Sequence, residues 1–139
     1  MARDIILSIE TDAPPSTVYE ALTSAEGLAA FWTPSVEASA AVGATLRFGF
    51  EAAPVDLEVT IADLVPGSRV AWDVEGPWPY WGGTRVEWTL TDSRVVFTHR
   101  GWNEDQAEAD FGSVALTWAL VLQALKAYVE SGVPAPALA

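Results

Sequence analysis

The single histidine, His99, is the residue best suited to acid–base chemistry near neutral pH. It alternates with Val95 and Phe97 along a predicted strand, so its imidazole should share their inward face. In that position it could move a proton to or from a bound ligand. It could also be a half-buried structural histidine bonded to a backbone carbonyl or a carboxylate, and we prefer this second interpretation. His99 is therefore a weak candidate for a catalytic residue.

Residues for other kinds of catalytic centre are missing from the sequence. The chain has no cysteine, which excludes thiolate zinc sites, iron–sulfur clusters and cysteine nucleophiles. With one histidine, a metal site would have to consist of carboxylates alone, and no clustered-acid pattern supplies one. No Gly-x-Ser-x-Gly motif marks a serine nucleophile. We therefore expect no metal and no cofactor, and we favour a binding protein over an enzyme.

Tryptophan is unusually frequent, with seven residues in a chain of 139. The strand and helix periodicities place most of the aromatic side chains toward one shared interior. Tryptophan offers a large apolar surface and one N–H donor, which suits a pocket for a flat or apolar ligand. The same rings could instead fill the space that a ligand would need, and the sequence leaves both alternatives open. The predicted ligand-binding residues are Trp32, Phe48, Trp72, Trp88, Phe97, His99, Phe111 and Trp118.

Residues 76–83 combine two prolines, three glycines and three aromatic side chains. This composition predicts a loop between two strands, at the mouth of the interior. Three large rings are costly to leave in water, so Trp78, Tyr80 and Trp81 are predicted to gate access or to contact a partner chain. The alternative is that these rings fold back onto the edge of the sheet.

The elements that position these residues follow from periodicity, beginning at the N-terminus. Residues 5–9 alternate between apolar and more polar side chains, which predicts a strand. Pro15 can begin a helix because its missing N–H would have no partner in a first turn. Thr23 and Glu26 have the spacing of a capping box, which predicts a second short helix that ends before Pro34.

Five alternating runs follow, at residues 46–50, 57–61, 70–74, 86–90 and 95–99. Each run has one apolar face, as in antiparallel strands with one covered and one solvated face. Asn103 and Gln106 then have the spacing of an N-cap pair. An apolar stripe at intervals of three and four residues predicts a helix of about 25 residues that ends at Gly132. The sheet and this helix must bury their apolar faces against each other.

The chain is strongly acidic, with nineteen acidic and seven basic residues and a formal net charge of −12. This charge repels phosphate backbones, so we expect no nucleic acid partner. No run reaches the roughly 18 apolar residues of a membrane span and the N-terminus lacks a secretory pattern, so we expect a cytoplasmic protein without membrane insertion. The length fits a single domain over residues 1–139, with a core at about 5–132 and a frayed tail over 133–139.

Several segments resemble the SRPBCC superfamily, also called START-like or Bet v 1-like, and within it the AHSA1-like domain related to the activator of the Hsp90 ATPase. The segments are APPSTVYEALTSAEGLAAFWTP, LVPGSRVAW, GTRVEWTLTD, VVFTHRGW and LKAYVESG. The resemblance implies an α+β helix-grip fold. In this fold a curved antiparallel sheet of six or seven strands wraps around a long C-terminal helix, and two short helices follow the first strand. The superfamily includes lipid carriers, hormone receptors, polyketide cyclases and co-chaperones.

Three functional hypotheses follow. The first, which we favour, is a protein that binds a small apolar or aromatic ligand in the helix-grip cavity. The second is an enzyme of cyclase or hydratase type, in which His99 and a neighbouring acid move protons on the substrate. The third is a protein-interaction module that resembles the co-chaperone domain. A homodimer would form if the aromatic loop or an edge strand pairs across a two-fold axis.

Overall fold

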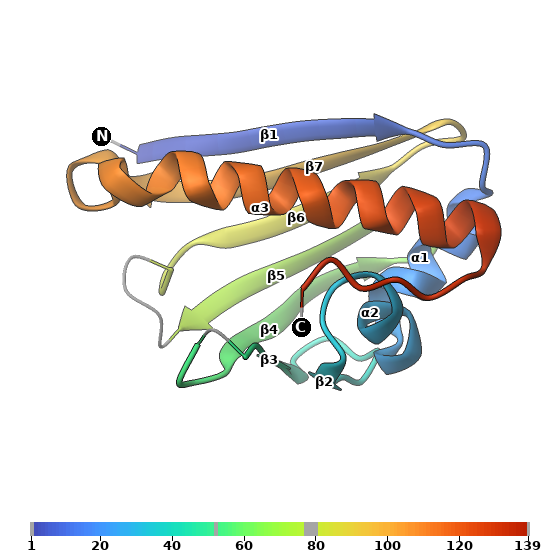
Figure 1. Ribbon diagram of the computed structural model, residues 1–139, viewed down its shortest axis with the longest axis horizontal. Coiled ribbons are helices and arrows are strands. Elements are labelled where there is room, and N and C mark those ends of the chain that lie inside the picture. The colour runs from blue at the N-terminus through green and yellow to red at the C-terminus, as the bar shows by residue number, and fades with distance from the viewer. Residues whose placement is uncertain (1, 52, 77–80, 139) are drawn as a thin grey trace.

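The computed structural model describes residues 2–51, 53–76 and 81–138, without the side chains of residues 2–3 and 103–112. The described part contains one open sheet of seven antiparallel strands, in the order β1-β7-β6-β5-β4-β3-β2, and three helices (Figure 1). The strands are β1 Ala2–Glu10, β2 Ser35–Glu37, β3 Thr45–Gly49, β4 Leu57–Val65, β5 Arg69–Gly76, β6 Arg85–Leu90 and β7 Arg94–Asn103. The helices are α1 Pro15–Thr23, α2 Ala25–Phe31 and α3 Glu104–Ser131. The predicted α+β helix-grip fold is confirmed.

The register between strands brings their apolar faces together. Trp72 of β5 pairs with Ile61 of β4 on one side and with Val86 of β6 on the other, and Val86 pairs in turn with His99 of β7. Residues directly opposite each other in antiparallel strands point to the same face of the sheet. All four side chains are buried. The alternation of the sequence therefore places these residues correctly across the centre of the sheet.

The long helix α3 lies along this apolar face, and α1 and α2 gather at the end of the sheet where β1 ends (Figure 1). The buried side chains described in α3 are Trp118, Val121, Leu122 and Leu125, which belong to the predicted stripe. The helix ends where Gly132 takes a positive φ of 74° and donates its N–H to the carbonyl of Tyr128. In the part of the chain that the structure describes, no helix combines the length and the apolar character needed to cross a bilayer.

The C-terminal end of α3 is fastened to the connection between β1 and α1. Lys126 Nζ donates to the carbonyl of Glu10 at 2.6 Å and to the carboxylate of Glu130 at 2.8 Å. Thr11 Oγ1 donates to the same carboxylate at 2.6 Å. The bond from Lys126, and then the bond from Thr11, lowers the pKa of Glu130 below its usual value. These contacts fix where the helix lies relative to the edge strand β1.

The short helices begin as their residue types require, with one correction. Pro15 occupies the first turn of α1, as predicted. The N-cap of α2 is Ser24 and not the predicted Thr23, because the Ser24 hydroxyl accepts the N–H of Gly27 at 3.0 Å. The Thr23 hydroxyl instead donates to the carbonyl of Tyr19 within α1. The predicted N-cap is therefore one residue too early, because either of two adjacent hydroxyl side chains could have capped the helix.

The C-terminal tail is bonded to α2, whereas the sequence suggested a frayed end. The N–H groups of Ala135, Ala137 and Leu138 donate to the carbonyls of residues 30, 31 and 32 at 2.9–3.0 Å. Figure 1 shows this segment in red, running from the end of α3 across α2. Ala137 and Leu138 also pack against the core. The tail gains order because the last carbonyls of α2 have no partners within that helix and can accept its N–H groups.

Candidate functional site

His99 lies at the centre of the buried face and is held at both ring nitrogens. The indole Nε1–H of Trp118 in α3 donates to Nδ1 of His99 at 3.1 Å. On the other side, Nε2 lies 2.8 Å from Oγ1 of Thr84, the residue before β6. The Thr84 hydroxyl gives its only proton to the carbonyl of Trp81 at 2.6 Å. It must therefore accept from His99, which makes the imidazole a neutral ring protonated at Nε2.

This environment disfavours the charged form of the imidazole. Burial lowers the pKa of His99 from 6.5 to about 3, and its side chain has no exposed surface. A proton-transferring role would need a second titratable group within hydrogen-bond reach. The described partners, Thr84 and Trp118, do not titrate near neutral pH. The arrangement therefore favours the structural interpretation of His99 over the cyclase or hydratase hypothesis.

Trp118 is the centre of one half of an aromatic cluster between α3 and the sheet. Its ring centroid lies 4.5 Å from that of Phe97 and 5.0 Å from that of Trp32. Trp88, His99 and Trp81 also lie near it, at 6.1, 5.9 and 6.1 Å. Centroid separations of this size are those of rings in direct contact. Trp118 thus joins α3 to residues from α2, β6 and β7.

The other half of the cluster is arranged around Trp32, the residue that caps the end of α2. Its ring is stacked on Trp72, with an angle of 5° between the planes, and it lies 4.3 Å from Phe48. Trp72 in turn meets Trp88 edge to face at 5.8 Å. The structure therefore brings seven of the predicted residues together: Trp32, Phe48, Trp72, Trp88, Phe97, His99 and Trp118. The rings are in contact, so at these positions they fill the space between α3 and the sheet.

Three indole N–H groups in this region have no acceptor in the part of the chain that the structure describes. The Nε1 atoms of Trp72, Trp88 and Trp102 are buried and have no hydrogen-bond partner among the residues that the structure describes. Trp118 differs from them because its N–H is bonded to His99. Buried donors are nearly always paired in folded proteins, so three buried indole N–H groups without a described acceptor are unusual.

Trp102 is a buried aromatic residue that the sequence periodicity does not predict. Its ring meets His99 at 4.6 Å and Trp81 at 5.4 Å, although strict alternation from His99 would point it outward. Gly101 explains the difference, because its positive φ of 86° breaks the alternation in β7. The pairing of β1 with β7 is irregular at the facing positions, between Arg3 and Ile5. A glycine directly before a tryptophan in a strand was the available signal.

Of the predicted gate residues, Trp81 is half-buried and folds onto the cluster, with its ring 4.9 Å from His99 and 6.1 Å from Trp118. Trp78 and Tyr80 lie outside the described residues, as does the side chain of Phe111. The position of Trp81 matches the alternative in which the rings of the loop turn back onto the protein. A gating role for this segment remains a hypothesis.

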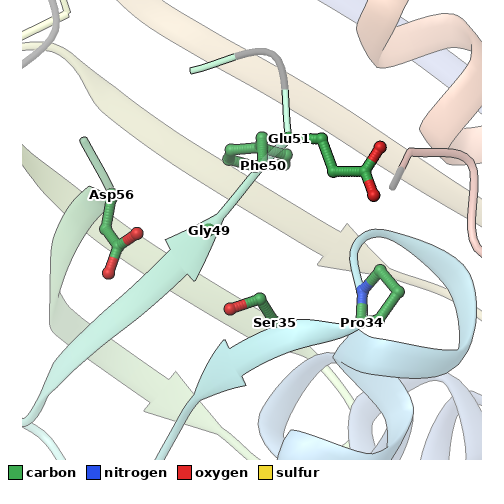
Figure 2. Close-up of a pocket in the computed structure, with 6 residues that line it drawn as sticks. All are labelled: Pro34, Ser35, Gly49, Phe50, Glu51 and Asp56. Carbon is green, nitrogen blue, oxygen red and sulfur yellow. The ribbon is translucent and has the colours of Figure 1, made fainter. Parts of the chain in front are cut away.

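A separate cleft of about 390 Å³ opens beside the ends of β2 and β3 (Figure 2). It is lined by Pro34, Ser35, Gly49, Phe50, Glu51 and Asp56. Figure 2 shows the Ser35 hydroxyl and the Asp56 carboxylate on either side of Gly49, with the Phe50 ring beside the Glu51 side chain. No sequence pattern predicts this cleft, because the strand β2 at its edge is only three residues long.

The basic side chains of the described part are engaged elsewhere. Six of them each lie within 4.0 Å of a carboxylate: Arg47, Arg69, Arg85, Arg94, Arg100 and Lys126. Their partners are Glu58, Asp63, Glu87, Asp73, Glu10 and Glu130, which do not include Glu51 or Asp56 of the cleft. Among the described residues, no group of three or more histidine or acidic side chains is placed to hold a metal ion.

Comparison with known proteins identifies the family. The model for "Activator of Hsp90 ATPase homolog 1-like protein" matches residues 12–130. The chain belongs to this AHSA1 family. A comparison with curated proteins found no match.

Solved structures of similar fold agree with this assignment. The Aha1 dimer from Colwellia psychrerythraea is 29% identical to the AHSA1 chain described here, with a TM-score of 0.81 over 94% of this chain and 98% of that one. Protein SSP2350 from Staphylococcus saprophyticus is 24% identical, with a TM-score of 0.75 over 98% and 100% of the two chains. Protein MLL2253 from Mesorhizobium loti is 18% identical, with a TM-score of 0.79 over 92% and 97%. The last two show the fold alone.

Proposed function

We propose that this protein binds a small, neutral, apolar or aromatic molecule between the sheet and α3. The observation that carries the proposal is the set of buried indole N–H groups of Trp72, Trp88 and Trp102, which have no described acceptor. A buried donor without an acceptor costs about 1–3 kcal/mol. A ligand with a carbonyl or ether oxygen would supply an acceptor, while its apolar body would keep the aromatic rings out of water.

The electrostatics of the aromatic cluster favour an uncharged ligand. Its one titratable member with a described environment, His99, is neutral because burial lowers its pKa to about 3. The described ion pairs contain no member of the cluster. A charged ligand would therefore lose its hydration without gaining a counter-charge, which is unfavourable in an apolar interior.

Ligand binding in this cluster requires local separation of α3 from the sheet, because the rings now touch. The bond between Trp118 and His99 holds the middle of α3, and Lys126 and Thr11 hold its C-terminal end. A local opening that keeps these anchors would leave the rest of the fold unchanged.

The test uses two probes that differ in one acceptor, benzophenone and diphenylmethane, with tryptophan fluorescence and thermal unfolding as the readouts. Benzophenone should bind more tightly and raise the melting temperature more, because its carbonyl can accept an indole N–H. The variants Trp72→Phe and Trp88→Phe keep a ring and remove one donor each, so they should reduce the preference for benzophenone. Equal responses to the two probes, or no response to either, would contradict the proposal.

We also propose that the chain forms a homodimer through the edge strand β1. The 29% identical protein from Colwellia psychrerythraea is a dimer. In this chain β1 is an edge of the sheet, and its Ile6 side chain is 66% exposed. Light scattering after size exclusion should show a dimer that Ile6→Asp weakens. Val42→Asp is the matched control because Val42 is 64% exposed in a loop. A monomer at all concentrations would overturn this proposal.

A further inference from the structure

We propose that the cleft beside β2 and β3 binds a small organic ammonium ion with an apolar or aromatic body. This site is distinct from the aromatic cluster and takes a ligand of different chemistry. Its volume of about 390 Å³ lies in the range of small-molecule sites, roughly 300–1,000 Å³. The lining combines an apolar wall with two carboxylates, which lie to either side of the Phe50 ring in Figure 2.

The carboxylates of Glu51 and Asp56 give the cleft its preference for a cation. Among the described residues, the six basic side chains with ion pairs contact other carboxylates, and none of these ion pairs involves Glu51 or Asp56. The net charge of −12 adds a long-range attraction for positively charged ligands. An anionic ligand would be repelled both by the cleft and by the protein as a whole.

The apolar part of the cleft is formed by Pro34 and Phe50. Phe50 is attached to the core, since its ring centroid lies 5.9 Å from that of Trp32. A fixed aromatic ring can pack against a hydrocarbon group or receive a cation on its face. This wall explains why an aryl or alkyl amine fits the cleft better than a bare inorganic cation, which could not use it.

Gly49 brings the polar groups of the cleft close together. It pairs with Ser35 of β2, and its carbonyl accepts the hydroxyl of Thr33 at 2.6 Å. A Cβ at this position would lie 2.7 Å from Oγ of Ser35 and 3.1 Å from Oδ1 of Asp56. Only glycine lets these two oxygens approach the same stretch of backbone. The Ser35 hydroxyl can thereby accept a second N–H of an ammonium group that is bound to Asp56.

The experiment compares 2-phenylethylamine with 2-phenylethanol, which has nearly the same shape and no charge. Binding is followed by NMR chemical-shift changes at low ionic strength. The amine should shift the signals of Ser35, Gly49 and Phe50, and added salt should weaken its binding. The alcohol should bind at least several-fold more weakly. Equal shifts from both probes would show that the cleft recognises only the ring, and the proposal would be wrong.

Variants assign the effect to the two carboxylates. Glu51→Gln and Asp56→Asn should each weaken amine binding by roughly two- to fivefold, as expected for an exposed charge pair. Asp92→Asn is the matched control, because Asp92 is exposed in the turn between β6 and β7. Unchanged affinity in the double variant Glu51→Gln/Asp56→Asn would overturn the proposal. Trp88→Phe tests the aromatic cluster separately and should leave amine binding intact.

Discussion

The indole N–H of Trp118 donates to Nδ1 of His99 across 3.1 Å, and this bond joins the middle of α3 to the centre of β7. The other ring nitrogen of His99 donates to Thr84, which in turn donates to the carbonyl of Trp81. Each group in this series of hydrogen bonds has a definite role as donor or acceptor, because Thr84 has only one hydroxyl proton. The imidazole therefore fixes the positions of α3, β7 and the start of β6 relative to one another.

The low pKa of His99 predicts acid-sensitive stability. The imidazole has a pKa of about 3 in the folded protein and about 6.5 when unfolded, so between these values only the unfolded state binds the proton. The stability contribution is complete above pH 6.5 and is lost as the pH falls toward 3. At pH 5 the loss is about 2 kcal/mol.

Urea unfolding at pH 7 and pH 5 checks this expectation. Carboxylates also contribute to acid sensitivity, so the informative quantity is the difference between the native chain and His99→Gln. The native chain should lose about 2 kcal/mol more than the variant between the two pH values. An equal loss in both proteins would show that His99 is not the group responsible.

Trp118→Phe should destabilise the protein by more than the loss of ring area alone. The substitution leaves Nδ1 of His99 buried without a donor, which costs about 1–3 kcal/mol. Trp88→Phe is the matched control, because it removes a similar area and an N–H that has no acceptor among the described residues. Denaturant unfolding of both variants measures the difference. A cost as large for Trp88→Phe would contradict the assigned hydrogen bond.

Gly101→Ala should destabilise the end of β7. The positive φ of 86° costs an L-residue about 1–2 kcal/mol, although the nearest atoms to a new Cβ are 3.8 Å away and leave it room. Gly101→Asn should cost less, because asparagine tolerates this backbone conformation. Thermal unfolding ranks the variants. If alanine and asparagine were equally harmful, strain in φ would not be the cause.

Leu138→Ala should lower stability by about 1 kcal/mol, because the side chain of Leu138 is partly buried against the core. Val133→Ala is the control, since Val133 is 63% exposed and precedes the bonded part of the tail. Denaturant unfolding distinguishes the two. A frayed tail would make both substitutions neutral.

Local periodicity predicted the faces of Trp72, Trp88 and Phe97, because the side-chain period of a strand is two residues. It failed at Trp102, where a left-handed Gly101 interrupts that period. The α3 stripe was equally predictable from its spacing, as the burial of Trp118 shows.

Contacts between distant segments were beyond the reach of the sequence patterns. Thr84 and Trp118 lie 15 and 19 residues from His99, and nothing in the spacing identifies them as its partners. The cleft depends on the approach of Ser35 and Asp56 to Gly49, three positions that only the folded sheet brings together. The order of the tail has the same origin, because its acceptors belong to α2.

The bonded tail has a practical consequence for handling the protein. An affinity tag added close behind Leu138 would follow a residue whose N–H is bonded to the carbonyl of Trp32. Tension or bulk at that junction would be transmitted to an indole that stacks on Trp72. Fluorescence titrations should therefore be performed on protein whose C-terminus carries no added sequence.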